Sequence, residues 1–127
     1  MKQAVNEWRR QNGRRNYRAG LAAEESVARA YQARGHRIAA RRWRGSRGEI
    51  DIVAREGDGL VFIEVKKARD FARAAERLTR AQMRRIYGAA SEFLAGEPKG
   101  QLTPVRFDVA LVNASGQMQV IENVFCM

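Results

Sequence analysis

Residues 48–66 read GEIDIVAREGDGLVFIEVK. Two runs rich in Ile, Val and Phe flank a short segment with two glycines, a pattern typical of a β-hairpin. Side chains alternate between the faces of a strand, so Glu49 and Asp51 share one face of the first strand. Glu64 and Lys66 likewise share one face of the second. Four charged residues therefore interrupt two strands that are otherwise apolar.

These charges need a physical reason, because an ionised group in an apolar strand is costly unless it is paired or binds a metal. Carboxylates at the ends of adjacent strands offer the oxygen ligands that Mg²⁺ and Mn²⁺ prefer. With a lysine beside them, they suit phosphodiester hydrolysis: the metal polarises the phosphate and activates a water, and the ammonium stabilises the developing negative charge. The alternative is a surface hairpin with exposed ion pairs, such as Asp51 with Lys66.

The same residues resemble the YraN family of small bacterial proteins. The resemblance rests on residues 48–51 (GEID) and 61–66 (VFIEVK) and extends from about Arg18 to Phe125. It includes residues 20–24 (GLAAE), 35–36 (GH) and 106–109 (RFDV). This family is related in fold to archaeal Holliday junction resolvases and to the restriction-endonuclease-like superfamily, marked by Asp followed by Glu-x-Lys.

The resemblance implies a divalent-metal-dependent endonuclease acting on branched or otherwise structured DNA. Asp51, Glu64 and Lys66 would be the catalytic residues. Asp51 and Glu64 would bind Mg²⁺ or Mn²⁺, and Glu24 or Glu49 would complete the metal site. The resemblance also implies a homodimer, because resolvases cut symmetrically, and the exposed apolar part of the C-terminal hairpin is a candidate interface.

Two departures from the family pattern keep a second hypothesis open. Relatives usually carry an arginine where this chain has Ala68, with Arg69 one residue later, and a lysine where it has Gln82. A protein that retains the fold and the charge, binds nucleic acid and cuts nothing is therefore the alternative. An RNA-binding accessory protein is a third hypothesis that rests on charge alone.

Charge is the strongest compositional signal. The 127 residues carry 24 Lys and Arg against 14 Asp and Glu, a net charge of +10. A basic domain of this size attracts polyanions, and we expect nucleic acid, most naturally DNA, as its partner. The cationic and aromatic residues expected to contact it are Arg41, Arg42, Trp43, Arg44, Arg47, Lys67, Arg69 and Arg84. Trp43 can instead be a core anchor for its strand.

Composition also excludes several classes of protein. The chain has one Cys, Cys126, and one His, His36, so it holds no internal disulfide and no zinc cluster. The sequence shows neither a signal peptide nor an apolar run long enough to span a bilayer, and we expect a cytoplasmic protein that does not enter the membrane.

The pattern along the chain predicts one domain, at 18–127, preceded by a basic N-terminal arm at 1–17. This arm is mobile or forms a short helix around Val5 to Arg10 that frays before Gly13. Residues 18–34 have helical spacing, with Glu24 on the stripe that packs inward, where it approaches the metal or pairs with an arginine.

Gly35 should end this helix, and residues 36–43 read as a strand. After a polar connection, Thr79 should open a second helix with Gln82 as its capping-box partner. This helix carries an apolar stripe formed by Met83, Ile86, Tyr87, Ala90, Phe93 and Leu94, and Arg80, Arg84 and Arg85 line its other side.

Residues 105–112 and 117–124 predict a second hairpin. Asp108 is a lone acid on its first strand, which favours a structural partner of an arginine over a metal ligand. This order gives an α/β three-layer sandwich, with a central mixed sheet of about five strands flanked by helices, as in the restriction-endonuclease-like core.

Overall fold

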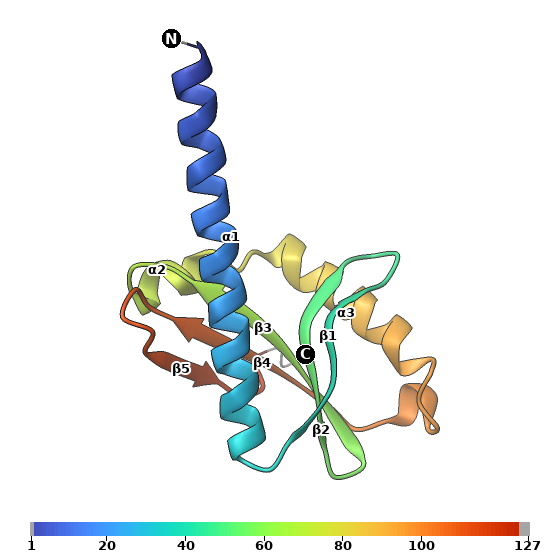
Figure 1. Ribbon diagram of the computed structural model, residues 1–127. Helices are drawn as coiled ribbons and strands as arrows, with labels where there is room; N and C mark the ends of the chain where they lie inside the picture. Colours follow the sequence, from blue (N-terminus) through green and yellow to red (C-terminus); the bar gives the residue numbers. More distant parts are fainter. Residues whose placement is uncertain (1, 125–127) are drawn as a thin grey trace.

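The computed structural model describes the backbone of residues 2–124 and the side chains of residues 17–124. Its elements in chain order are α1 (Lys2–Ala33), β1 (Arg37–Arg44), β2 (Glu49–Glu56), β3 (Gly59–Lys67), α2 (Phe71–Glu76), α3 (Arg80–Leu94), the 3₁₀ helix η1 (Gly100–Leu102), β4 (Val105–Val112) and β5 (Met118–Ile121). Figure 1 shows that the N-terminal half of α1 extends beyond the rest of the fold.

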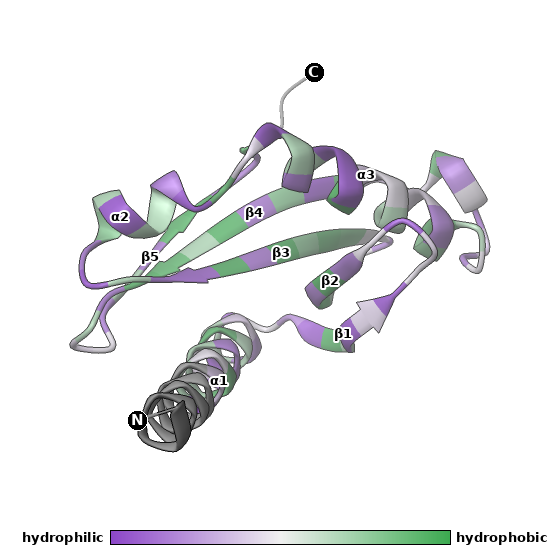
Figure 2. Ribbon diagram, turned by 90° about the horizontal axis from the view of Figure 1, so that it is seen from above, coloured by the Kyte–Doolittle hydropathy of each residue, from purple (hydrophilic) through white to green (hydrophobic). Residues whose placement is uncertain are grey.

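The five strands form one sheet in the order β1-β2-β3-β4-β5. The pairs β1–β2, β2–β3 and β4–β5 are antiparallel, and β3–β4 is parallel. Helix α1 covers one face of this sheet, and α2 and α3 lie over the other (Figure 2). The predicted α/β architecture, with a mixed five-stranded sheet between helices, is confirmed.

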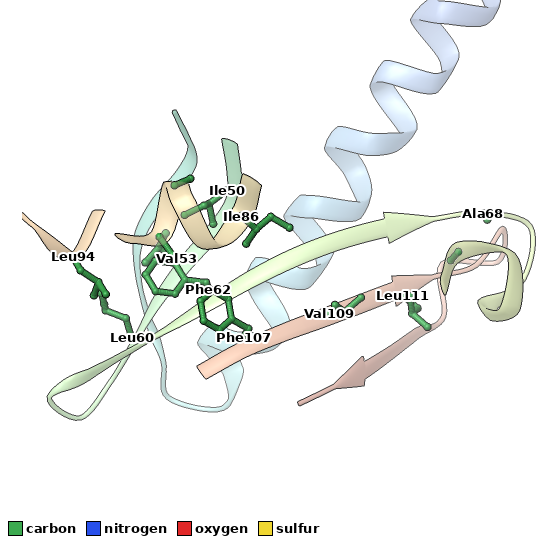
Figure 3. Packing of buried hydrophobic residues seen from close by; sticks show 13 residues of the cluster. Ile50, Val53, Leu60, Phe62, Ala68, Ile86, Leu94, Phe107, Val109 and Leu111 are labelled. Atoms are coloured by element: carbon green, nitrogen blue, oxygen red, sulfur yellow. The ribbon is translucent and has the colours of Figure 1, made fainter. Parts of the chain in front are cut away.

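The core divides into two clusters because alternate residues of β3 point to opposite faces. Leu60 and Phe62 pack with Ile86 and Leu94 of α3 (Figure 3), whereas Val61 and Ile63 face α1. The apolar stripe predicted for the second helix is the one that packs on the sheet. Both faces of β3 are therefore covered along its first half.

Two helices differ from the prediction. Helix α1 begins at Lys2 and runs without a break to Ala33, so a helix that starts at Arg18 after a fraying arm is wrong. A glycine inside a helix costs only about 1 kcal/mol, and residues 2–17 contain no proline to stop it. Helix α2 occupies part of the expected polar connection, and Asp70 caps it by accepting from the backbone N–H of Arg73 at 2.8 Å.

The other predicted boundaries are close to those observed. Gly35 ends α1 with φ +93, and Thr79 and Gln82 form the expected capping box of α3. Strand β5 is shorter than predicted, and Cys126 lies outside the described residues.

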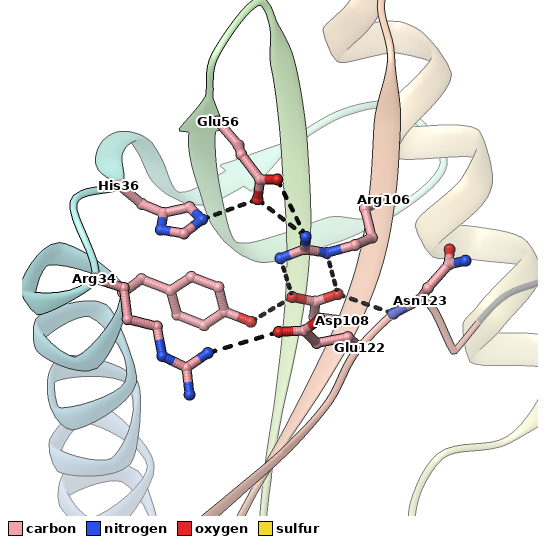
Figure 4. A network of polar contacts seen from close by, with 8 residues as sticks. Arg34, His36, Glu56, Arg106, Asp108, Glu122 and Asn123 are labelled. Carbon is pink, nitrogen blue, oxygen red and sulfur yellow. Dashed lines mark hydrogen bonds and ion pairs between the residues drawn. The ribbon is translucent and has the colours of Figure 1, made fainter.

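A polar network ties the C-terminal end of α1 to β4 (Figure 4). The buried Asp108 carboxylate accepts from the Tyr31 hydroxyl at 2.6 Å, from Arg106 Nε at 2.9 Å and from the backbone N–H of Asn123 at 3.0 Å. His36 and Arg106 both contact Glu56. Asp108 is thus a structural partner of an arginine, as its position on a strand predicts.

Replacing Tyr31 with Phe should lower the free energy of unfolding by about 1–3 kcal/mol, because the buried Asp108 would lose a hydrogen-bond donor. Urea denaturation measures the loss. Tyr17→Phe is the matched control, since Tyr17 is 60% exposed and far from Asp108 in the sequence. Equal stability of the two variants would show that the Tyr31 hydroxyl contributes nothing to the fold.

Candidate functional site

A fork between β2 and β3 positions the predicted acids. Pairing of the two strands ends at Ile52 and Ile63, beyond which β3 continues along β4 while the start of β2 pairs only with β1. In the gap the backbone N–H of Val65 donates to the Asp51 carboxylate at 2.8 Å. Asp51 therefore takes a backbone donor that a regular ladder would have given to a carbonyl group.

The fork brings together the three residues that the sequence singled out. Glu64 is 8% exposed, and the Lys66 ammonium lies 3.1 Å from its Oε1. Asp51 interacts electrostatically with both Glu64 and Lys66. The ion pair joins Lys66 to Glu64 rather than to Asp51, so the surface hairpin with an Asp51–Lys66 pair is not the observed arrangement.

Burial and mutual repulsion make both acids reluctant to ionise. Burial, and then the charge of Glu64, raise the pKa of Asp51 to about 8. Burial also raises the pKa of Glu64, although the neighbouring Lys66 ammonium and a hydrogen bond with Asp51 offset part of that rise. In the metal-free protein near neutral pH, the pair therefore holds a shared proton.

A cavity of about 260 Å³ opens beside this acid pair. Its lining comes from Glu49, Asp51 and Glu64 on the sheet and from Gln82, Arg85 and Ile86 on α3. The sequence analysis placed Arg85 on the opposite side of its helix from the apolar stripe. The sequence signal for Arg85 in this cavity is its spacing of three residues from Gln82, which sets both residues on one helix face.

Glu24 lies on the other side of Asp51. A smaller cavity of about 120 Å³ is lined by both residues, and the charge of Glu24 raises the pKa of Asp51 and of Glu64. The Glu24 carboxylate accepts from Arg42 Nε at 2.8 Å. Arg42 reaches it from a left-handed backbone conformation, φ 49, which is uncommon outside glycine. The expected alternative, a pair between Glu24 and an arginine, is what the structure shows.

Glu49 is held in a similar way. Its carboxylate lies 3.3 Å from Arg44 Nε, while the residue lines the cavity beside Asp51. Glu24 and Glu49 are thus both close to the acid pair, and each is bound to an arginine of β1.

The donor set tests which metal this site could hold. Within residues 17–124 no group of three or more His, Cys, Asp and Glu side chains is arranged to hold a metal ion. Zinc in structural sites needs such a group, whereas Mg²⁺ is commonly bound by one or two carboxylates and keeps several waters. Asp51 and Glu64 beside an open cavity therefore fit Mg²⁺ or Mn²⁺.

The expected nucleic-acid contacts on β1 are engaged within the chain. Arg41 pairs with Glu25, Arg42 with Glu24 and Arg44 with Glu49. The Trp43 ring packs edge-on against Phe93, 5.3 Å between centroids, so it is the core anchor of the alternative reading.

The turn after β1 is fixed to α3. Glu92 accepts from the backbone N–H groups of Ser46 and Arg47 at 2.8 and 3.2 Å and from the Ser46 hydroxyl at 2.6 Å. Gly48 approaches α3 closely: a Cβ atom there would lie 3.1 Å from the Cβ of Arg85. Arg47 is exposed, and its side chain packs over Gly88 of α3.

Cations without an ion pair gather around the fork. Within residues 17–124, the cationic side chains that have no ion pair with another described residue are Arg18, Arg37, Arg47, Lys67, Arg69, Arg77, Arg80, Arg84 and Arg85. All except Arg18 and Arg37 lie on the β1–β2 turn, at or after the end of β3, at the end of α2, or on α3. Most of the cations without an ion pair therefore lie on the elements next to the fork.

The structure defines an α/β protein whose mixed sheet carries a buried acid pair and a lysine at a strand fork. Residues 23–112 match the model of the uncharacterised protein family UPF0102, and the chain belongs to this family. It is 60% identical to a UPF0102 protein of Ruegeria pomeroyi over 89% of its own length and 92% of that protein. It is 63% identical to one from Cereibacter sphaeroides over 90% and 97%, respectively.

None of the helices in the described part of the chain has the length and apolar character that crossing a bilayer requires.

Proposed function

We propose that this chain is a divalent-metal-dependent endonuclease that hydrolyses phosphodiester bonds in DNA, including branched or structured DNA. The observation that carries the proposal is the partly buried triad, with Lys66 3.1 Å from Glu64 and Asp51 in the same strand fork. The resemblance to the YraN family and to resolvases supports the choice of DNA. Structure selectivity rests on that resemblance alone.

Each residue of the triad has a role that follows from its position. Asp51 and Glu64 would hold Mg²⁺ or Mn²⁺, and the backbone N–H of Val65 orients the Asp51 carboxylate. When bound, this ion would polarise the scissile phosphate and lower the pKa of the attacking water. The Lys66 ammonium lies beside the Glu64 carboxylate and stabilises the negative charge that develops on the phosphate oxygens.

The cations without an ion pair would attract a polyanion to the site. Several cations, such as Arg55 with Glu97 and Lys99 with Asp58, are neutralised by carboxylates. The unpaired cations on the elements next to the fork are not, so their charge is available to phosphate groups. Arg85 lines the cavity beside the acid pair and would contact a phosphate next to the one that is cut.

A panel of end-labelled DNA substrates tests the proposal: duplex, single strand, flap and four-way junction, each with Mg²⁺, with Mn²⁺ and with EDTA. We expect metal-dependent products from the wild type and none from Glu64→Gln, which keeps the shape of the side chain and removes its charge. If no substrate is cut by the wild type with either metal, the chain is not an endonuclease.

A second candidate function is a nucleic-acid-binding protein with a silent site. Ala68, which is buried where relatives usually carry an arginine, favours it. Gln82, which lines the acid cavity where relatives carry a lysine, favours it too. In that case the same panel would show binding that falls steeply with salt and no cleavage.

A homodimer follows from the nuclease proposal if both strands of a symmetric substrate are cut. On the C-terminal hairpin Val105 and Ile121 are 41% and 39% exposed, which makes the hairpin a candidate interface. Sedimentation equilibrium of the wild type and of Ile121→Glu measures the association. A monomer at every concentration would rule out the dimer.

A further inference from the structure

A further cavity lies beside the fork, and Lys66 alone of the catalytic residues lines it. It has a volume of about 510 Å³ and lies between α1 at Ala19 and Gly20 and the segment Val65–Arg69, with Arg77 and Ala114 completing its lining. We call it the basic groove. Lys66 belongs both to this groove and to the ion pair with Glu64, so the groove begins where the acid pair ends.

Among the residues whose side chains the structure describes, the groove is lined by cations and by no acid. Of these, Lys67, Arg69 and Arg77 have no ion pair with another described residue. Three uncompensated charges facing one cavity repel one another, which is unfavourable unless an anion lies between them. The described part of the lining also contains no aromatic side chain, so a bound chain of nucleotides would be recognised there through its phosphates and not by stacking of its bases.

The floor of the groove is held rigidly. The backbone N–H of Ala68 donates to the carbonyl of Val112 at 3.1 Å, and the N–H of Ala114 donates to the carbonyl of Arg69 at 3.3 Å. Both bonds tie the segment after β3 to the end of β4 and its turn. Lys67 and Arg69 therefore extend from a fixed backbone, which lowers the entropy lost when they bind a ligand.

Gly20 of α1 also lines the groove. Glycine is about 1 kcal/mol less favourable than alanine inside a helix, so the stability of α1 does not explain a glycine at this position. No packing contact with residues 17–124 requires it either. Apart from its chain neighbours and the backbone of its own helix, a Cβ atom at this position would have no atom of the described side chains within 4 Å. A glycine with open space beside it, on the wall of a cationic cavity, fits a site where a ligand approaches the helix closely.

We propose that the basic groove binds the sugar-phosphate backbone of one polynucleotide strand, next to the phosphate that is cut; this deepens the proposed function and rests on it. We assign the groove a single strand because its volume, about 510 Å³ between α1 and the segment after β3, is small for a duplex. Gly20 is also one turn before Glu24 on the same helix face, which sets the path of the strand toward Asp51.

Filling the groove tests the proposal. Gly20→Leu places a side chain in the open space and should not harm the fold, because leucine favours helix. Ala22→Leu is the matched control: Ala22 is exposed on α1, and two residues at 100° each turn it away from Gly20. Fluorescence anisotropy in EDTA measures the binding of a labelled single-stranded oligonucleotide and of a blunt duplex, so no cleavage is involved.

We expect Gly20→Leu to weaken single-strand binding at least about 10-fold, a change of about 1.4 kcal/mol. Ala22→Leu should bind as the wild type does, and both variants should bind the blunt duplex with little change. Arg69→Ala with Arg77→Ala should also reduce the salt dependence of single-strand binding, by about 0.7 per lost phosphate contact.

Unchanged single-strand binding by Gly20→Leu overturns the groove proposal, and so does an equal loss for Gly20→Leu and Ala22→Leu. A loss confined to the duplex means that the groove holds a duplex edge and also overturns it. The outcome is separable from that for the nuclease: the groove fails alone if Gly20→Leu binds and cuts as the wild type does. The nuclease fails alone if the wild type cuts nothing but Gly20→Leu still loses single-strand binding.

Discussion

Asp51→Asn should reduce metal-dependent DNA cleavage by roughly 10³-fold or more, because it removes the negative charge of one of two carboxylates that would hold the ion. The amide keeps an oxygen that can accept from the backbone N–H of Val65, so the strand fork should remain intact. Initial rates of cleavage at saturating Mg²⁺ and Mn²⁺ measure the effect. Binding of the uncut DNA in EDTA should change little, since the cations around the site are untouched.

Asp58→Asn is the matched control for this substitution. Asp58 lies in the turn of the same hairpin, and its side chain is 86% exposed with only a long 3.6 Å contact to Lys99. The same chemical change there should leave the cleavage rate within about twofold of the wild type, since an exposed pair of this kind contributes little. Undiminished cleavage by Asp51→Asn would exclude the acid pair from the reaction, whatever the control shows.

The part of the site that the sequence predicts is the part built on one hairpin. Strand alternation is local, so it places Glu64 and Lys66 on a common face without knowledge of the rest of the fold. The same rule places Glu49 and Asp51 together on β2. What it does not supply is the fork, because the end of β2–β3 pairing depends on where β1 and β4 take over.

The partners of the first helix and of β1 could not be read from the sequence. Glu24 is separated by 18 residues from Arg42, and their contact needs both the packing of α1 on the sheet and the unusual backbone of Arg42. Arg77 could not be predicted for a similar reason. It lines a cavity formed by segments distant in the chain, so no local pattern marks it.

Short helices are a second feature that is hard to predict from the sequence. Helix α2 spans six residues, too few for helical periodicity to stand out. Its one sequence signal is the Asp70 cap. The start of α1 at Lys2 was missed for a different reason. Asn and Gly in the arm lower the helix propensity but do not break the helix.

The acid pair should also make the metal-free protein less stable as pH rises. The pKa of Asp51 is raised from an ordinary value of 3.8 to about 8 in the folded chain, mainly by burial and by Glu64. Between these values the folded protein keeps a proton that the unfolded chain has released, so the free energy of unfolding falls with increasing pH. The contribution is fully present below about pH 4 and lost above about pH 8.

The expected loss across this range is on the order of a few kcal/mol, since one pKa unit corresponds to about 1.4 kcal/mol. Urea denaturation at several pH values between 5 and 9, in EDTA, measures it for the wild type and for Asp51→Asn. The variant has no Asp51 proton to lose, so its stability should vary less with pH, and it should be the more stable protein at the alkaline end.

Added Mg²⁺ should reverse the trend in the wild type, because an ion between the two carboxylates replaces the shared proton and binds more strongly as that proton leaves. Its stabilising effect should therefore grow from pH 6 to pH 9 and be much smaller in Asp51→Asn. Parallel pH profiles for the two proteins without metal would show that Asp51 ionises as freely in the folded chain as in the unfolded one. Asp51 and Glu64 would then be ordinary solvated carboxylates, and binding of a divalent ion would gain nothing from cancelling their mutual repulsion.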